Sequence, residues 1–155
     1  MPKYFEDATF GVKPEDVIAR IVKRATSTYI SPSMVSQSIV NEFCRSGAID
    51  RSIATVREAL RARADALAEA LTRELPDACF VAPDGGYFLW VDLPEAIDVD
   101  ELHVAAAERG VQFVKGSDFM LDGGEHSLRL AYSGVTVEQI EEGVRRLAAA
   151  TGALV

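Results

Sequence analysis

Residues 50–75 constrain the fold more than any other part of the chain. Apolar side chains recur there at steps of three or four residues, with Ala64 filling the one gap in a stripe of Ile53, Val56, Leu60, Leu67, Leu71 and Leu75. This spacing puts all of them on one side of a helix. The pattern predicts one long helix, capped by Asp50 and ended by Pro76, with that side against a hydrophobic core.

Other helices are predicted from their end signals. Pro14 fits the first turn of a helix that runs to about residue 24, and Ser31 caps a second helix that ends before Gly47. Asp98 followed by Glu101 is typical of a capping box, and this helix ends at Gly110. A final helix is capped by Thr136 and Gln139 and stops at Gly152.

Short apolar segments predict the strands, which are expected over residues 79–81, 87–91, 111–114 and 127–133. Together these elements predict an α+β sandwich, in which a small mixed or antiparallel sheet is covered by helices. The boundary is expected near Gly47, with residues 1–47 as a less self-contained lead-in and linker and residues 48–155 as the compact domain.

Composition excludes some partners. The formal net charge is −8 and no basic run offsets it, which argues against nucleic acid or an anionic membrane. The N-terminus lacks an apolar signal core, and no stretch is long enough to span a bilayer. Cys44 and Cys79 lie in apolar segments and form no C-x-x-C pair, so buried free thiols in the cytoplasm are expected.

Arg129 is the most informative candidate for function. It lies within an apolar strand, and strand alternation puts it on the same face as the small residues Ser127, Ala131 and Ser133. A guanidinium with small neighbours has room for a planar anion, and a carboxylate fits its donors bidentately. The alternative is an ordinary arginine that faces solvent.

Three other features leave alternatives open. Gly85 and Gly86, directly before an aromatic strand, fit either a simple hairpin turn or a place where another group approaches the backbone. Lys115 fits either a functional amine or an exposed lysine at a strand end. His103 and His126 lack metal-ligand spacing and are expected to be ordinary surface histidines.

Taken in order, three motifs resemble one family. They are Pro83-Asp84-Gly85-Gly86-Tyr87-Phe88-Leu89-Trp90, then Gly110-Val111 through Gly116-Ser117-Asp118-Phe119, then Leu128-Arg129-Leu130-Ala131-Tyr132-Ser133. This order resembles the C-terminal small domain of class I/II, fold-type I aminotransferases, which depend on pyridoxal 5'-phosphate. Within that family it is most similar to the branch of 2-aminoadipate and multi-substrate aminotransferases. The resemblance covers about residues 12–150.

The resemblance implies roles for a few positions. Arg129 corresponds to the arginine that grips the α-carboxylate of the amino-acid or 2-oxo-acid substrate. Gly85, Gly86 and Tyr87 would line the substrate entrance. Residues 31–37 would begin the helix that links the large and small domains, near a dimer interface. Lys115 stands where many relatives have proline, which leaves the subfamily open.

The resemblance also implies what is missing. The family's chemistry needs a lysine in a Ser-x-x-Lys motif that forms a Schiff base with the cofactor, and none of Lys3, Lys13, Lys23 and Lys115 has that context. We therefore expect a catalytically incomplete portion of an aminotransferase that binds no cofactor alone. The alternatives are a non-enzymatic binding or dimerisation module and one half of a split enzyme.

Overall fold

The computed structural model describes residues 14–28 and 33–154. The chain divides into two compact units between Arg51 and Ser52, and each is described by itself. The predicted division near Gly47, with its two assigned roles, stays a prediction.

The first unit contains two helices, α1 (Pro14–Thr28) and α2 (Met34–Arg45). The cap of α2 is Ser33, whose hydroxyl accepts a hydrogen bond from the backbone N–H of Ser36. The predicted cap, Ser31, lies outside the described residues. Gly47 follows the end of α2 with φ +69°, a conformation that glycine adopts without steric cost.

The long helix α3 (Ala48–Glu74) confirms the predicted helix, but the first part of its apolar stripe does not face the core, because Ile53 and Val56 are 45% and 46% exposed. Its second half is buried at Ala64, Leu67, Ala70 and Leu71. Asp50 is not the cap that we predicted, because the helix begins two residues earlier at Ala48. Asp50 instead lies in the first turn, where a carboxylate interacts favourably with the helix dipole.

The second unit has a four-stranded sheet in the order β1-β2-β4-β3, in which every neighbouring pair is antiparallel. The strands are β1 (Cys79–Phe80), β2 (Phe88–Asp92), β3 (Val114–Lys115) and β4 (Ser127–Ala131). Strands β2 and β3 both flank β4, and helix α4 (Val99–Glu108) connects them. The last strand in the chain, β4, is therefore inserted between two earlier ones.

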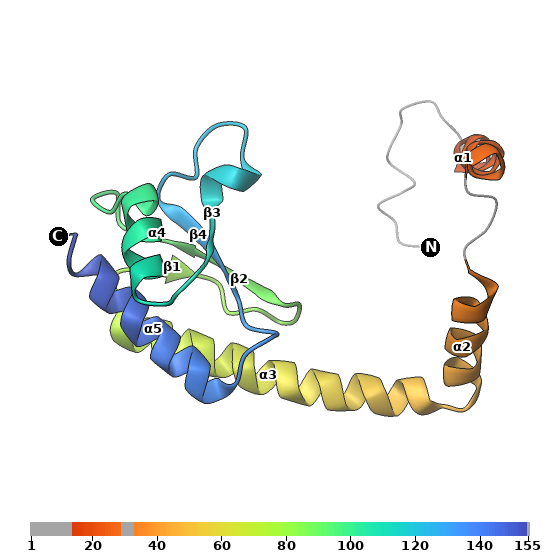
Figure 1. Ribbon diagram of the computed structural model, residues 1–155, viewed down its shortest axis with the longest axis horizontal. Helices are drawn as coiled ribbons and strands as arrows, with labels where there is room; N and C mark the ends of the chain where they lie inside the picture. Colours follow the sequence, from red (N-terminus) through yellow and green to blue (C-terminus); the bar gives the residue numbers. More distant parts are fainter. Residues whose placement is uncertain (1–13, 29–32, 155) are drawn as a thin grey trace. The chain divides into compact units, whose positions relative to one another are not determined.

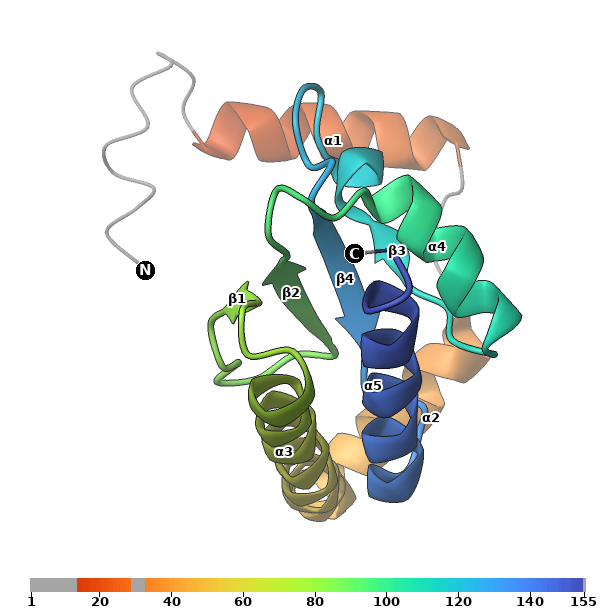
Figure 2. The same ribbon diagram turned by 90° about the vertical axis from the view of Figure 1, so that its left-hand side faces the viewer.

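Helices α3, α4 and α5 (Val137–Thr151) lie against one face of this sheet (Figures 1 and 2). The core between the two layers takes side chains from all three helices and from the central strands. Its fully buried members include Leu71, Val91, Leu102, Leu128 and Leu147. This arrangement confirms the predicted α+β sandwich with an antiparallel sheet.

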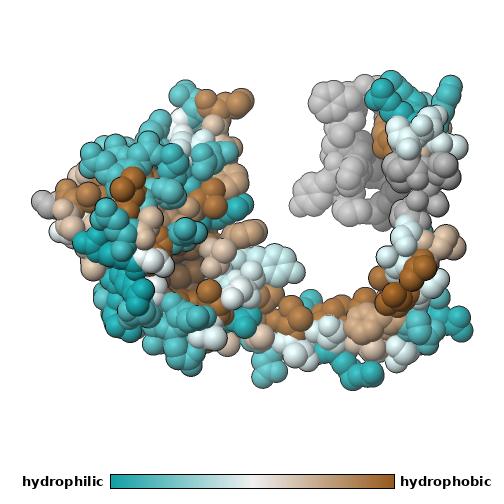
Figure 3. All heavy atoms as spheres, in the orientation of Figure 1, coloured by the Kyte–Doolittle hydropathy of each residue, from teal (hydrophilic) through white to brown (hydrophobic). Residues whose placement is uncertain are grey.

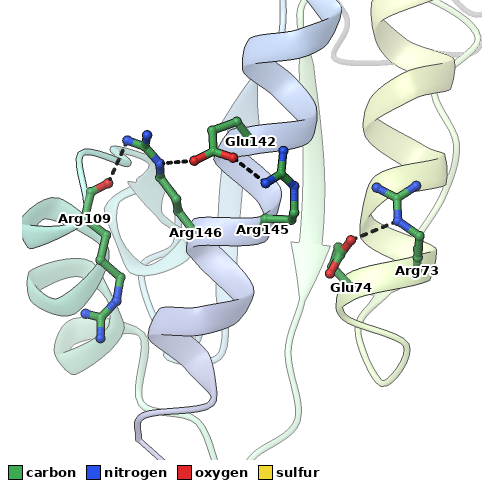
Figure 4. A network of polar contacts seen from close by, with 6 residues as sticks. All are labelled: Arg73, Glu74, Arg109, Glu142, Arg145 and Arg146. Carbon is green, nitrogen blue, oxygen red and sulfur yellow. Dashed lines mark hydrogen bonds and ion pairs between the residues drawn. The ribbon is translucent and has the colours of Figure 1, made fainter.

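Polar contacts tie α4 to α5 at the surface (Figure 4). Glu142 accepts a hydrogen bond from Arg146 and forms an ion pair with Arg145, both at 2.7 Å. Arg146 also donates to the backbone carbonyl of Arg109, just past the end of α4, at 3.2 Å. The Arg146 hydrogen bond, together with the charge of Arg145, holds the pKa of Glu142 below its usual range.

Both predicted capping signals in this unit are confirmed as N-caps. Asp98 accepts from the backbone N–H groups of Asp100 and Glu101. Thr136 and Gln139 form the complete capping box of α5.

Other predictions need correction. Strand β2 has the expected length but is shifted by one residue, to Phe88–Asp92. The other three strands are shorter than expected: β1 ends at Phe80, β3 begins only at Val114, and β4 ends at Ala131, where the chain leaves the sheet for the turn before α5. The two cysteines are free but exposed, not buried. Cys79 pairs with Asp92 on the edge of the sheet, and Cys44 lies on α2, which buries none of its residues. Among the described helices, none is apolar over enough length to cross a bilayer.

Lys115 joins β3 to the beginning of α4. Its ammonium group lies 2.6 Å from the Asp100 carboxylate. That hydrogen bond, and next the charge of Asp100, raises the pKa of Lys115 above the ordinary 10.5. Because the folded pKa exceeds the unfolded one, the stabilisation is fully present below about pH 10.5 and is lost as the pH rises through the raised pKa.

Asp100→Asn should therefore bring the Lys115 pKa back towards its ordinary value. The measurement is a titration of the Lys115 side chain by NMR. Asp118→Asn is the matched control, since Asp118 acts on Lys115 through its charge and not through a hydrogen bond, and it should lower the pKa less. An unchanged Lys115 titration in Asp100→Asn would show that this ion pair is absent in solution.

Candidate functional site

The candidate site lies on the sheet face opposite the helices. Leu89, Val91, Leu128 and Leu130 point into the core, so alternation turns the residues between them to the other face. The register places Trp90 of β2 and Val114 of β3 directly across from Arg129 of β4. Arg129 is thus at the centre of this second face, with a neighbour on each side.

Two aromatic rings enclose the Arg129 guanidinium. Its Cζ atom lies 4.1 Å from the centre of the Phe88 ring and 4.3 Å from that of Phe119. Both distances are within the range of a cation–π interaction. The prediction of small neighbours holds along the strand itself, at Ser127 and Ala131, but the neighbours from other elements are aromatic.

The donors of Arg129 are left available. Its Nε is buried and has no hydrogen-bond partner among the residues that the structure describes. The described ion pairs join other residues and none includes Arg129. A buried donor without a partner costs about 1–3 kcal/mol, so such a group calls for an explanation. A bound anion that offsets the charge of the guanidinium provides one.

The carboxylate on the same face is already engaged. Asp92 Oδ1 accepts a hydrogen bond from the Trp90 indole at 2.9 Å and another from the Ser127 hydroxyl at 2.7 Å. Trp90 is paired with Arg129 in the register, and Ser127 lies two residues before Arg129 on β4 and is paired with Asp92. Asp92 therefore holds the Trp90 ring in place, and no ion pair of the described residues joins it to Arg129.

Phe119 reaches the site on the short 3-10 helix η2 (Gly116–Phe119). This helix is held by a backbone contact between Gly116 and Gly124. A Cβ on Gly116 would lie 2.8 Å from the Gly124 carbonyl oxygen, and a Cβ on Gly124 would lie 2.7 Å from the backbone of Gly116 and Ser117. Gly124 also has φ +86°. Only glycine fits at both positions, and their contact fixes the start of the turn that carries Phe119.

Gly85, Gly86 and Tyr87 lie in the turn between β1 and β2, all three exposed. Two hydrogen bonds tie the turn to the end of β4: Tyr132 N–H donates to the Tyr87 carbonyl at 3.1 Å, and the Tyr132 hydroxyl donates to that of Gly85 at 3.4 Å. Gly86 has φ +93°, while a Cβ on either glycine would meet nothing within 4 Å. The turn conformation accounts for Gly86, and within the described residues no group approaches either glycine closely.

A cavity of about 710 Å³ lies between this turn and α3. Its lining includes Arg57, Arg61, Gly85 and Gly86, together with Tyr132, but not Arg129. The predicted entrance residues and Arg129, the residue predicted to bind the carboxylate, therefore lie in one unit and are connected through Tyr132 and Phe88. They line different surfaces of that unit.

Other candidates from the sequence are structural. Lys115 donates to Asp100 and is not a free amine. His126 is half-buried, and its Nδ1 lies 2.9 Å from the Ile97 carbonyl, so it is not the surface histidine that we expected. His103 is half-buried too, with its ring 5.2 Å from that of Phe113. Among the described residues, no group of three or more histidine, cysteine and acidic side chains could hold a metal ion.

Reasoning from the sequence missed Phe88, Trp90 and Phe119 as members of the site. Alternation along residues 87–91 puts Phe88 and Trp90 on the face opposite the core residues Leu89 and Val91. The two-residue period of a strand could therefore have identified Phe88 and Trp90 from the sequence. Phe119 lies in a loop with no periodic signal, and only the three-dimensional arrangement brings it to Arg129.

Comparison with known proteins agrees with the fold of the second unit. The family model for aminotransferase class I and II matches residues 8–147. The 2-aminoadipate transaminase of Thermus thermophilus is 35% identical over 89% of this chain and 35% of its own length. The crystal structure of LysN, the α-aminoadipate aminotransferase of the same organism, gives a TM-score of 0.81 at 34% identity, over 92% of this chain and 37% of that one.

The multiple substrate aminotransferase of Thermococcus profundus gives a TM-score of 0.82 at 29% identity, over 92% of this chain and 36% of that one. The chain thus spans about a third of the length of the relatives that it matches. Since the family model covers most of its residues, the chain belongs to the class I and II aminotransferases, and its second unit has the fold of their small domain.

Proposed function

We propose that this chain is the C-terminal portion of a pyridoxal-phosphate-dependent aminotransferase, in which Arg129 binds the α-carboxylate of an amino-acid or 2-oxo-acid substrate. One observation carries the proposal: Arg129 has no anionic partner among the described residues, at the centre of a sheet face where the nearby Asp92 is engaged by Trp90 and Ser127.

The chemistry of the site favours a carboxylate. The guanidinium offers donors in a planar fork that match two carboxylate oxygens. The Phe88 and Phe119 rings lie 4.1 Å and 4.3 Å from its central carbon. They would reduce its contact with water, and a charge-assisted hydrogen bond is stronger where water is excluded. We expect the approach to this site to be bordered by Gly85, Gly86 and Tyr87. The hydrogen bonds between their turn and the end of β4 support this placement.

The cofactor of the family, pyridoxal phosphate, supplies the electron sink for chemistry at the α-carbon when it is bound. Among the described residues of the second unit, no lysine offers a free amine that could hold this cofactor. Lys115, the lysine of the second unit, is engaged by Asp100, and its raised pKa keeps it protonated and not nucleophilic. We propose that this chain supplies substrate recognition, while the reactive lysine belongs to another segment or another chain.

We also propose that the protein is located in the cytoplasm. The exposed free thiols of Cys44 and Cys79 are consistent with a reducing compartment, which fractionation with thiol labelling would test.

Arg129→Ala should weaken carboxylate binding and leave the fold intact. Trp90 is the single tryptophan and lies across from Arg129, so its fluorescence reports ligand binding directly. With 4-methylpentanoate as the probe, affinity should fall about tenfold or more, because the charge-assisted pair is lost. The free energy of unfolding in urea should change by about 1 kcal/mol or less, since the loss of two cation–π contacts is offset by the removal of an unpaired buried donor.

Two controls sharpen this experiment. Arg145→Ala removes an exposed arginine of α5 that is paired with Glu142, and it should leave probe affinity unchanged. The neutral isostere 4-methylpentanamide should not bind the unaltered chain. Equal affinity for 4-methylpentanoate before and after Arg129→Ala would remove Arg129 from the site.

The chain alone should not take up the cofactor. Adding pyridoxal phosphate should give no saturable visible absorbance band of a protein-bound cofactor and no turnover of 2-aminoadipate with a 2-oxo acid. If such a band formed, Lys115→Met would show whether Lys115 is the amine responsible. A band together with turnover in the unaltered chain would refute the proposal that another segment supplies the lysine.

A second candidate function is a dimerisation module, and one observation favours it. Large apolar side chains are exposed on α1 and α2, and Figure 3 shows hydrophobic atoms at the surface of α2. On α2, Val35, Ile39 and Phe43 recur at four-residue steps and are 71%, 66% and 41% exposed. A helix stripe of this kind fits the same stripe on a second copy of the chain.

If this second function holds, the purified chain should elute as a dimer in size-exclusion chromatography with light scattering. Ile39→Glu should convert it to a monomer, because a buried unpaired carboxylate would oppose association. Ser38→Glu adds the same charge on the neighbouring exposed position of α2 and should leave the dimer intact. A monomer at all concentrations would count against the module.

A further inference from the structure

We propose that Phe88 and Phe119 act as a pair of positioning residues, which hold the Arg129 guanidinium so that it presents only the edge of its two terminal nitrogens to a carboxylate. This inference rests on the proposed function and adds the geometry of recognition. Neither ring needs to touch the substrate; both act through Arg129.

The first step is the placement of the rings. Cζ of Arg129 lies at nearly equal distances from the two ring centres, 4.1 Å for Phe88 and 4.3 Å for Phe119. Two rings this close to the guanidinium carbon leave little room for a ligand to approach from their side. Each ring contributes a cation–π attraction that also opposes swinging of the long side chain.

The second step concerns the donors that remain. Nε is buried, while the terminal nitrogens are absent from the buried unpaired atoms of the described residues. The accessible donors are therefore the N–H groups of the two terminal guanidinium nitrogens. A carboxylate that meets them end-on forms two parallel hydrogen bonds, and a side-on approach through Nε is blocked.

The third step is what fixes the rings. Phe88 belongs to β2, whose pairing with β4 sets its position against Arg129. Phe119 depends on η2, which the backbone contact of Gly116 with Gly124 holds in place. The edge of the Phe119 ring also meets Trp90, at 5.9 Å between centroids and 71° between planes, and Asp92 in turn holds the Trp90 indole.

The test compares Phe119→Leu with Phe119→Tyr in the full chain. Leucine removes the ring and tyrosine keeps it. We expect Phe119→Leu to weaken 4-methylpentanoate binding about three- to tenfold and Phe119→Tyr to restore it to within about twofold. Leu121→Ala, in the same loop and fully exposed, is the control and should change nothing. The backbone amide NMR spectrum confirms that each variant is folded.

A spectroscopic measurement separates positioning from general structure, and it needs no ligand. In the unaltered chain, the Arg129 Nε–H resonance should be shifted by the ring currents, and rotation about Nε–Cζ should be slow. Phe119→Leu should reduce both effects, whereas Phe119→Tyr should keep them. Added carboxylate should shift the terminal N–H resonances more than that of Nε–H.

The outcomes distinguish this inference from the function on which it rests. If Arg129→Ala weakens carboxylate binding but Phe119→Leu changes neither affinity nor the Arg129 resonances, the positioning role is wrong and the proposed function stands. If the carboxylate shifts Nε–H most, the end-on geometry is wrong. If the unaltered chain binds no carboxylate, the proposed function fails, and unchanged Arg129 resonances in Phe119→Leu would overturn the positioning role separately.

Discussion

The pairing of β2 with β4 is the interaction on which the rest of the second unit depends. It is the longest ladder of the sheet, with five residue pairs from Phe88 opposite Ala131 to Asp92 opposite Ser127. On one face it lines up the leucines and valines that the helices cover. On the other face the same register brings Trp90 beside Arg129. A shift of one residue would exchange the faces, so the core and the candidate site are set by the same hydrogen bonds.

The residues around Arg129 explain why a charged side chain is tolerated at the centre of the sheet. The Phe88 and Phe119 rings lie near the guanidinium carbon of Arg129. The nearby carboxylate of Asp92 accepts hydrogen bonds from Trp90 and Ser127. A neighbouring acid in direct contact would have stabilised the empty site and competed with any ligand. The arrangement instead keeps one positive group partly buried and without an ion-pair partner among the described residues, which is unfavourable for folding and favourable for binding an anion.

The sequence predicted the elements well wherever a local signal existed. The long helix α3, the Asp98 cap and the capping box at Thr136 depend on residues close in the chain, and all appear in the structure. Asp50 was misplaced because a carboxylate is favourable both as a cap and within the first turn. Arg129 was found from its strand, but its contact with Phe119 was not, since a loop and a glycine contact separate them and no periodicity joins them.

The two outer strands of the sheet have a consequence for self-association. Both β1 and β3 are only two residues long, so each offers very few free backbone groups to a strand from another molecule. A short edge is a poor template for edge-to-edge growth. The domain can therefore expose Phe88 and Phe119 on an open sheet face without inviting continuous β-pairing, and its contacts with other proteins are directed to side chains instead of to the backbone.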